Sequence, residues 1–198
     1  MIVDAITYKV GDPMVRGAVL GGRRSEYRYE LGRSWDLTKP VLVVCMLNPS
    51  TADAERDDPT VLTLIHFAKL WGYGGLRIVN LFAFRTSKPT ELLECDVRFG
   101  PDNGRYIEAA MDYAAKNGGR LLAAWGNGGE LDDRGDWFCA RASHVYQLDL
   151  ICLGLARGSR WAGPVHRYNP KHPMARGKHR IPRDQMPIMY REAYRGAA

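Results

Sequence analysis

The sequence lacks the features of a membrane-spanning or exported protein. No apolar run approaches the roughly 20 residues that a helix needs to cross a bilayer. Residues 1–10 contain Asp4 and do not show the basic and then apolar order of a signal peptide. The chain also lacks internal repeats and low-complexity linkers. We therefore expect a single domain over residues 1–198, located in the cytoplasm and not in contact with a membrane.

Cysteine is scarce, and its pattern excludes the common cysteine-based sites. The sequence has four cysteines, and none of them forms a C-x-x-C pair. Their spacing matches neither a zinc site nor an iron–sulfur binding run. Cys45 and Cys152 lie inside apolar segments, where a thiol behaves as a small hydrophobic group. We therefore expect buried, reduced thiols, and we predict no metal ion and no cofactor.

Positive charge is in excess, because 28 lysines and arginines against 22 aspartates and glutamates give a net charge of +6. A basic balance favours an anionic partner, above all DNA, either single- or double-stranded. Much of the excess lies in residues 157–183, where Trp161 and Tyr168 alternate with cations in a way that favours stacking on bases. A solvated charged segment is the alternative. The residues expected to contact the DNA backbone are Arg160, Lys171, Arg176, Lys178 and Arg180.

Apolar runs and turn residues predict an α/β fold. The first 36 residues are predicted to be a β-rich extension, in which residues 27–31 alternate and Gly17, Gly21 and Gly22 mark turns. Apolar runs of strand length follow at 41–47, 76–81, 121–125 and 148–153. Helical patterns occupy 60–71, 103–117, 133–143 and about 184–194. This alternation predicts a three-layer sandwich with a central, mainly four-stranded parallel sheet, preceded by the N-terminal β extension.

Polar and aromatic residues collect where the predicted strands end, which is where open α/β sheets bind their ligands. They are Asn48, Pro49, Ser50, Asn80, Trp125 and Asn127, followed after the fourth strand by His166 and His172. Each also has a structural explanation: turn formation for the asparagines, helix capping for Ser50, core packing for Trp125 and a surface position for His172. The acidic residues between 53 and 58 are either a solvated loop that starts a helix or ligands of Mg²⁺.

The motifs resemble those of a known family. LNPSTAD (47–53), DDPT (57–60), WGYGGLRIVNLFAFR (71–85), AWG (124–126), CLG (152–154) and a late HP (172–173) resemble the family catalogued as domain of unknown function 1643. The resemblance extends from residue 27 to residue 173 and covers most of the chain. The family name implies no activity.

The order of the motifs is also similar, at a greater distance, to the uracil-DNA glycosylase superfamily. That resemblance implies a uracil-DNA-glycosylase-like fold, in which Asn48 positions the attacking water, Asn80 binds the base and His172 donates to it. It also places Phe84 and Arg85 after Asn80 as in the thermophile-type members.

The sequence departs from the superfamily pattern in the first and last motifs. Met46 and Ser50 stand where the first motif has glycines, and no serine follows His172-Pro173. Residues 161–168 resemble an insertion, so His166 competes with His172 for the late histidine position.

These features together predict an enzyme that flips a pyrimidine base, modified or not, out of DNA and hydrolyses its N-glycosidic bond. Phe82 or Phe84 supplies a stacking face, and a neutral histidine stabilises the departing base. Two alternatives stay open. A base-modifying enzyme or transferase on the same fold would use Asp53 or His172 as acid or base. A non-catalytic module would only bind nucleic acid or a nucleotide.

Overall fold

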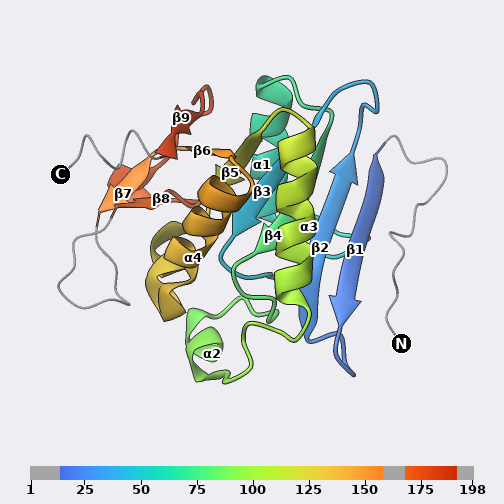
Figure 1. The fold of residues 1–198 in the computed structure, drawn as a ribbon, viewed down its shortest axis with the longest axis vertical. Coiled ribbons are helices and arrows are strands. Elements are labelled where there is room, and N and C mark those ends of the chain that lie inside the picture. Colours follow the sequence, from blue (N-terminus) through green and yellow to red (C-terminus); the bar gives the residue numbers. More distant parts are fainter. Residues whose placement is uncertain (1–13, 158–167, 191–198) are drawn as a thin grey trace.

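The computed structural model describes residues 14–157 and 168–190, and within them a seven-stranded sheet forms the centre of the molecule (Figure 1). The strands lie in the order β1 (Val15–Gly21), β2 (Tyr27–Ser34), β4 (Gly75–Asn80), β3 (Val41–Met46), β5 (Arg120–Ala123), β6 (Asp149–Cys152) and β9 (Ile188–Met189). The four central strands are parallel, whereas β1 and β2 at one edge and β9 at the other pair antiparallel. A separate antiparallel pair consists of β7 (Leu155–Arg157) and β8 (Tyr168–Pro170).

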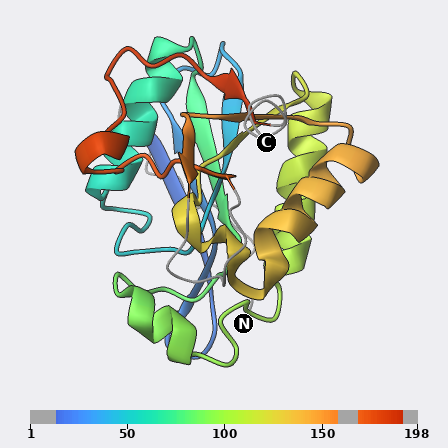
Figure 2. The same cartoon turned by 90° about the vertical axis from the view of Figure 1, so that its left-hand side faces the viewer.

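Helices cover both faces of this sheet. Those in the described ranges are α1 (Pro59–Leu70), α2 (Pro89–Glu94), α3 (Asn103–Lys116) and α4 (Arg134–Ala140). A 3-10 segment (Gly126–Asp133) precedes α4, a π-helical turn (Arg141–Val145) follows it, and a 3-10 turn spans Gly177–His179. Figure 2 shows α1 on one side of the sheet and α3 with α4 on the other. None of these helices is long and apolar enough to cross a membrane.

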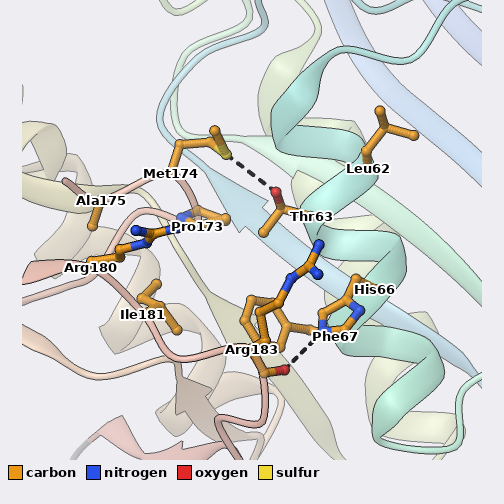
Figure 3. A pocket seen from close by; sticks show the side chains of 10 residues that line it. All are labelled: Leu62, Thr63, His66, Phe67, Pro173, Met174, Ala175, Arg180, Ile181 and Arg183. Carbon is orange, nitrogen blue, oxygen red and sulfur yellow. Dashed lines mark hydrogen bonds between the residues drawn. The ribbon is translucent and has the colours of Figure 1, made fainter.

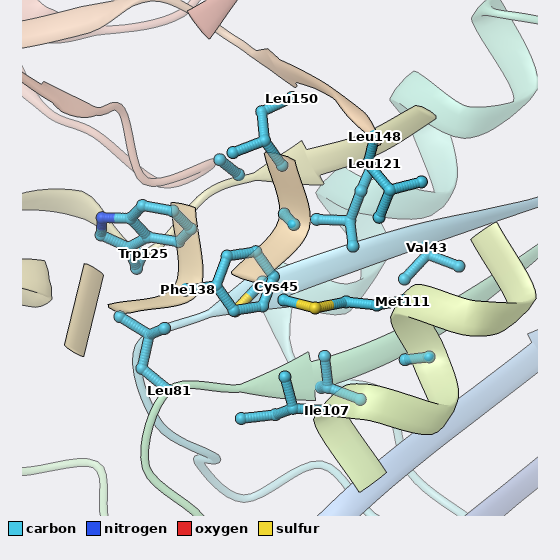
Figure 4. Close-up of a cluster of buried hydrophobic side chains, with 14 of the residues drawn as sticks. Val43, Cys45, Leu81, Ile107, Met111, Leu121, Trp125, Phe138, Leu148 and Leu150 are labelled. Atoms are coloured by element: carbon cyan, nitrogen blue, oxygen red, sulfur yellow. The ribbon is translucent and has the colours of Figure 1, made fainter. Parts of the chain in front are cut away.

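Side chains that alternate along the central strands divide the core between the two faces. Val43 and Cys45 of β3 pack with Met111 of α3 and Phe138 of α4 (Figure 4). Leu42 and Val44, which alternate with these two residues along β3, belong to the cluster under α1. The central strands are continuous apolar runs because both faces of the sheet are covered.

The two cysteines in the central strands are buried, as predicted, and neither forms a disulfide. Burial raises the pKa of the Cys45 thiol well above its ordinary value and that of Cys152 to about 11. Both thiols are therefore protonated at neutral pH and serve as apolar packing groups.

The structure confirms the four parallel strands and the helices expected at 60–71, 103–117 and 133–143. It corrects the two ends of the chain. Gly17 and Gly21 do not mark turns but lie inside β1, because the N-terminal β segment joins the same sheet; Gly22, with φ of 85°, does turn. The helix predicted at 184–194 is wrong over residues 184–189, because β9 pairs there with the otherwise open edge of β6. Residues 2–10 and 191–194 lie outside the described ranges.

Strand β2 departs from the pattern predicted for residues 27–31. Alternation predicts one face toward water, yet all five side chains are buried. The pairing of β2 with β1 skips Tyr29, which marks a β-bulge. The ring of Tyr29 stacks on Tyr106 of α3, with centroids 5.0 Å apart, while Arg28 faces the side of the sheet covered by α1.

Leu64 and Leu62 of α1 provide a matched test of this packing. Leu64 is 1% exposed, and Leu62 is 56% exposed. Leu64→Ala should lower the free energy of unfolding by about 2–5 kcal/mol, because it removes buried methyl groups and leaves a cavity. Leu62→Ala should change it by less than about 0.5 kcal/mol. Urea denaturation measures both values, and equal losses would contradict the placement of α1.

Candidate functional site

The loops that follow β3 and β4 are held together by hydrogen bonds. Leu81 N donates to the carbonyl oxygen of Met46, and Thr86 N donates to that of Pro49, each at 2.9 Å. The side chain of Asn48 adds a third link, because its Nδ2 donates to the carbonyl oxygen of Thr86 at 2.8 Å. The LNPSTAD and NLFAFR motifs therefore form one folded unit beyond the sheet.

The loop that carries His172 lies against the ends of β5 and β6. Lys171 N donates to the carbonyl oxygen of Gly154, just past β6, at 2.8 Å. Gly126, just past β5, has φ of +71°, and a Cβ at this position would lie 3.2 Å from Cβ of His172. Glycine permits both this backbone conformation and this close approach. The third and fourth strand ends thus hold the histidine in place.

Asn48, Ser50, Asn80 and His172, all predicted from the strand ends, line one cleft. The cleft lies on the α1 side of the sheet, and its other lining residues are Arg28, Met46, Asp58, Thr60, Val61, Leu64 and Ile78. Its enclosed part measures about 50 Å³, and the space including the open mouth measures about 350 Å³. Typical small-molecule pockets have roughly 300–1,000 Å³. The enclosed part therefore suits the polar edge of a ring rather than a whole ligand.

Asn80 brings a buried and uncommitted amide to this cleft. Asn80 is 1% exposed, and neither Nδ2 nor Oδ1 of its side chain has a hydrogen-bond partner within the described residues. Its main chain is fixed, because Nδ2 of Asn103, at the start of α3, donates to the carbonyl oxygen of Asn80 at 3.0 Å. The main chain at Asn80 is thus held in place, while the donor and the acceptor of its side-chain amide are left for a ligand.

His172 presents a neutral ring to the cleft. Its Nδ1 accepts a hydrogen bond from Met174 N at 3.1 Å, which assigns the proton of the neutral ring to Nε2. Burial lowers the pKa of His172 below its ordinary value, and the carboxylate of Asp58 opposes this effect only in part. At neutral pH the ring is therefore a hydrogen-bond donor without a positive charge.

Asn48 uses its hydrogen-bond donor within the protein and keeps its acceptor, whereas His172 keeps its donor. Its Nδ2 donates to the carbonyl oxygens of Pro49 and Thr86, at 3.0 and 2.8 Å. Both amide protons are therefore committed, and Oδ1 is the atom left to accept a hydrogen bond from water or from a ligand.

Arg28 and Asp58 line the cleft although they were not predicted as site residues. Arg28 lies in the alternating segment 27–31, whose pattern places it on a wet face; the bulge at Tyr29 is the feature that this pattern does not reveal. Asp58 is recognisable in the sequence as the start of a helix, and its Oδ1 does accept from Val61 N at 2.9 Å. Its other carboxylate oxygen forms no hydrogen bond within the described residues.

Several predicted residues do not reach the cleft. Phe82 and Trp125 continue the core past the strand ends, so neither offers the expected stacking face. The ring of Trp125 packs edge-on against Phe138 (Figure 4) and also against Tyr190. Phe84 packs on Tyr27, and Arg85 donates to the carbonyl oxygen of Ser25. Pro49 is buried beside the cleft and Asn127 is exposed. His166 and Arg160 lie outside the described residues.

The acidic residues 53–58 are organised by Arg33. Its Nε pairs with Asp57 at 2.6 Å, and its Nη2 donates to the carbonyl oxygen of Asp53 at 2.6 Å. The carboxylate of Asp53 accepts from Glu55 N and Arg56 N, and the first of these bonds is the main reason that its pKa is lowered. Asp53, predicted as catalytic, is therefore engaged in its own turn and does not line the cleft. Within the described chain, no group of three or more His, Cys, Asp or Glu side chains could hold a metal ion.

A groove runs beside the cleft, between α1 and residues 173–183 (Figure 3). His66 Nε2 bonds to the carbonyl oxygen of Arg183 at 2.8 Å, and the hydroxyl of Thr63 donates to Sδ of Met174 at 3.2 Å. The side chains of Arg180 and Arg183 line the groove, and neither forms an ion pair within the described residues. Arg176 and Lys178 lie exposed on the same segment, and Lys171 is half-buried.

The fold and the cleft define the class of protein: a three-layer α/β protein with a polar cleft at the carboxyl ends of a parallel sheet. A family model described as "Protein of unknown function (DUF1643)" matches residues 28–174, and the chain belongs to this family. No curated protein and no solved structure matches the chain. The matched range contains every residue that lines the cleft.

Gly126→Ala should disturb His172, and Gly118→Ala is its control. Both glycines have positive φ, but nothing lies within 4 Å of a Cβ placed at Gly118. The pKa of His172 should lie below 6.5 in the wild-type protein, because burial disfavours the imidazolium form. Gly126→Ala should push the ring toward water and raise this pKa toward 6.5, whereas Gly118→Ala should leave it unchanged. An NMR pH titration of the ring measures it, and a wild-type pKa above 6.5 would refute the assigned environment.

Proposed function

We propose that the protein is a DNA-acting enzyme that binds a pyrimidine base in the cleft and hydrolyses its N-glycosidic bond. The observation that carries the proposal is the Asn80 amide, buried in the cleft with no hydrogen-bond partner among the described residues. Leaving a buried polar group unpaired costs about 1–3 kcal/mol, so a ligand with a matching donor and acceptor would offset this cost. The Watson–Crick edge of uracil or thymine presents such a pair, with a ring N–H beside a carbonyl oxygen.

The groups around Asn80 suit the hydrolytic step. The Oδ1 of Asn48 holds a water whose oxygen attacks C1′ of the sugar, while the C1′–N1 bond breaks and leaves its electron pair on the base. Nε2–H of His172 donates to an oxygen of the base as negative charge develops there. The carboxylate of Asp58 takes the proton that the water loses, and the base anion is protonated by solvent. The products are a free base and an abasic sugar.

The size of the cleft supports entry by a base taken out of the DNA stack. The enclosed volume of about 50 Å³ receives the edge of the ring, and the sugar and backbone stay at the open mouth. An enzyme that reads this edge must break the base pair first, because in duplex DNA the edge is occupied by the partner base.

The basic groove beside the cleft supports DNA as the substrate. Arg180 and Arg183 bring two positive charges next to the His172 loop, and the exposed apolar side chains of Leu62 and Met174 also line the groove. Phosphates bind such cations, and an unstacked base covers such apolar side chains. The motif order similar to that of the uracil-DNA glycosylase superfamily supports the same reaction and a glycosylase-like form of the sheet.

Asn80→Ala and Asn127→Ala provide a paired test of the reaction. Labelled single- and double-stranded oligonucleotides that carry uracil, hydroxymethyluracil and other modified pyrimidines are incubated with the protein, and abasic sites are detected by alkaline cleavage. We expect product with at least one substrate, a loss of about 100-fold or more in kcat/KM for Asn80→Ala, and little change for the exposed Asn127→Ala.

The same assay separates the alternatives. Binding of DNA without any abasic product would replace hydrolysis by base modification or by binding alone. Asn48→Ala then distinguishes these two, because a binding module keeps its affinity and loses nothing else, whereas a modifying enzyme binds and stops turning over.

Salt dependence tests the basic groove. The affinity for a fluorescent oligonucleotide should fall steeply with salt, and each phosphate contact that is removed should reduce the slope of log K against log salt by about 0.7–0.9. Arg180→Ala with Arg183→Ala should therefore flatten the slope by roughly 1–2. Lys116→Ala, which removes an exposed lysine paired with Asp112 on α3, is the matched control and should leave the slope unchanged. An unaltered slope in the double variant would place the DNA elsewhere.

A further inference from the structure

The cleft contains a buried guanidinium group with no direct counter-charge. Arg28 is 3% exposed and lines the cleft together with Asn80 and His172. Its Nη1 donates to the carbonyl oxygen of Ala52, its Nε has no partner, and it forms no ion pair within the described residues. Arg33, on the same strand, shows the usual arrangement instead, because it pairs with Asp57 at 2.6 Å. The two arginines therefore differ in what satisfies their charge.

An unpaired buried charge is costly, so its retention calls for an explanation. Burial lowers the pKa of Arg28 to about 10, and the field of Asp58 acts in the opposite direction. The guanidinium group is therefore still charged at neutral pH. The bulge at Tyr29 is what allows Arg28 to face the cleft, and bulges next to binding sites commonly re-aim a side chain in this way. A ligand with a negative charge would supply the missing partner.

We propose that Arg28 makes the cleft selective for a pyrimidine ring that carries a negative charge. The inference rests on the proposed function and extends it: Asn80 reads the edge of the ring, and Arg28 donates a charge-assisted hydrogen bond to a ring oxygen.

The hydrolytic step explains why such selectivity is useful. A base attached to its sugar is neutral, and it becomes an anion only as the electron pair of the C1′–N1 bond passes to the ring. The bond from Arg28 is therefore stronger in the transition state than in the bound substrate, which is the condition for acceleration of the step.

Two free bases test the proposal without any turnover. At pH 7.5 uracil is neutral, whereas 5-nitrouracil is an anion because the nitro group withdraws electrons from the ring. Isothermal titration calorimetry gives the ratio of their affinities for each variant. We expect the wild-type protein to favour 5-nitrouracil by about tenfold or more. Arg28→Gln should bring the ratio down about tenfold, and Arg28→Lys, which keeps the charge, should retain most of it.

The size of the nitro group is the same in every experiment, so a change in the ratio measures the contribution of charge. The matched control is Arg120→Gln, because Arg120 is an exposed arginine at the start of β5, at the other end of this strand from the cleft, and does not line the cleft. Its ratio should equal that of the wild-type protein. Circular dichroism checks that each variant is folded. If Arg28→Gln does not fold, the test depends on Arg28→Lys. Loss of the preference for 5-nitrouracil in folded Arg28→Lys would then overturn the proposal.

The outcomes separate this inference from the proposed function. Binding of both bases with a ratio that is the same in the wild-type protein and in Arg28→Gln overturns the role of Arg28 and leaves base binding intact. Absence of binding for both bases, together with absence of abasic product, overturns both. A ratio that depends on Arg28 in a protein that cleaves no DNA supports the anion site and contradicts the hydrolytic reaction.

Discussion

The pairing of β3 with β4 is the constraint on which the site depends. Met46 lies opposite Asn80 at the ends of these strands, and main-chain hydrogen bonds continue past them from Leu81 to Met46 and from Phe82 to Leu47. Side chains alternate between the faces of a sheet, so a shift of one residue in β4 would turn the Asn80 amide into the α3 core. The apolar residues before Asn80 in β4 oppose such a shift, because Ile78 fills the core under α1 and Val79 fills the core under α3. Packing of the sheet thus fixes the position of a polar group that contributes nothing to the packing.

The loop after β3 gives the cleft its second wall. Arg33 of β2 holds this loop through Asp57 and the carbonyl oxygen of Asp53, and the loop then passes directly into α1. Asp58 caps that helix and at the same time faces the cleft. The start of α1 and the acidic side of the site are therefore a single feature. The composition of the acidic residues 53–58 is compatible with a metal site. In the structure, however, Asp57 pairs with Arg33 and Asp58 caps the start of α1.

The sequence predicts what depends on local periodicity and on the geometry of parallel strands. Continuous apolar runs locate β3 to β6, and the rule that parallel strands end at one edge brings Asn48, Asn80 and His172 together before any coordinates are known. The contribution of Arg28 depends on a bulge that no local pattern marks. Phe82 and Trp125 follow strand ends as the polar residues do, but their apolar rings extend the core instead. Position at a strand end therefore predicts a place in the cleft better for polar side chains than for aromatic ones.

The cleft residues share one mode of support. Main-chain groups occupy one part of the side chain in Asn48, Asp58 and His172, and the remaining polar atom forms no hydrogen bond within the described residues. Asn80 is held instead through its own carbonyl oxygen, to which Asn103 donates. Groups fixed in this way do not need to reorganise when a ligand binds or when charge develops on it, and such preorganisation is the main source of electrostatic stabilisation in enzyme sites. The cost is polar surface that this part of the chain leaves unsatisfied, and the two-sided apolar core of the sheet is what allows the fold to carry that cost.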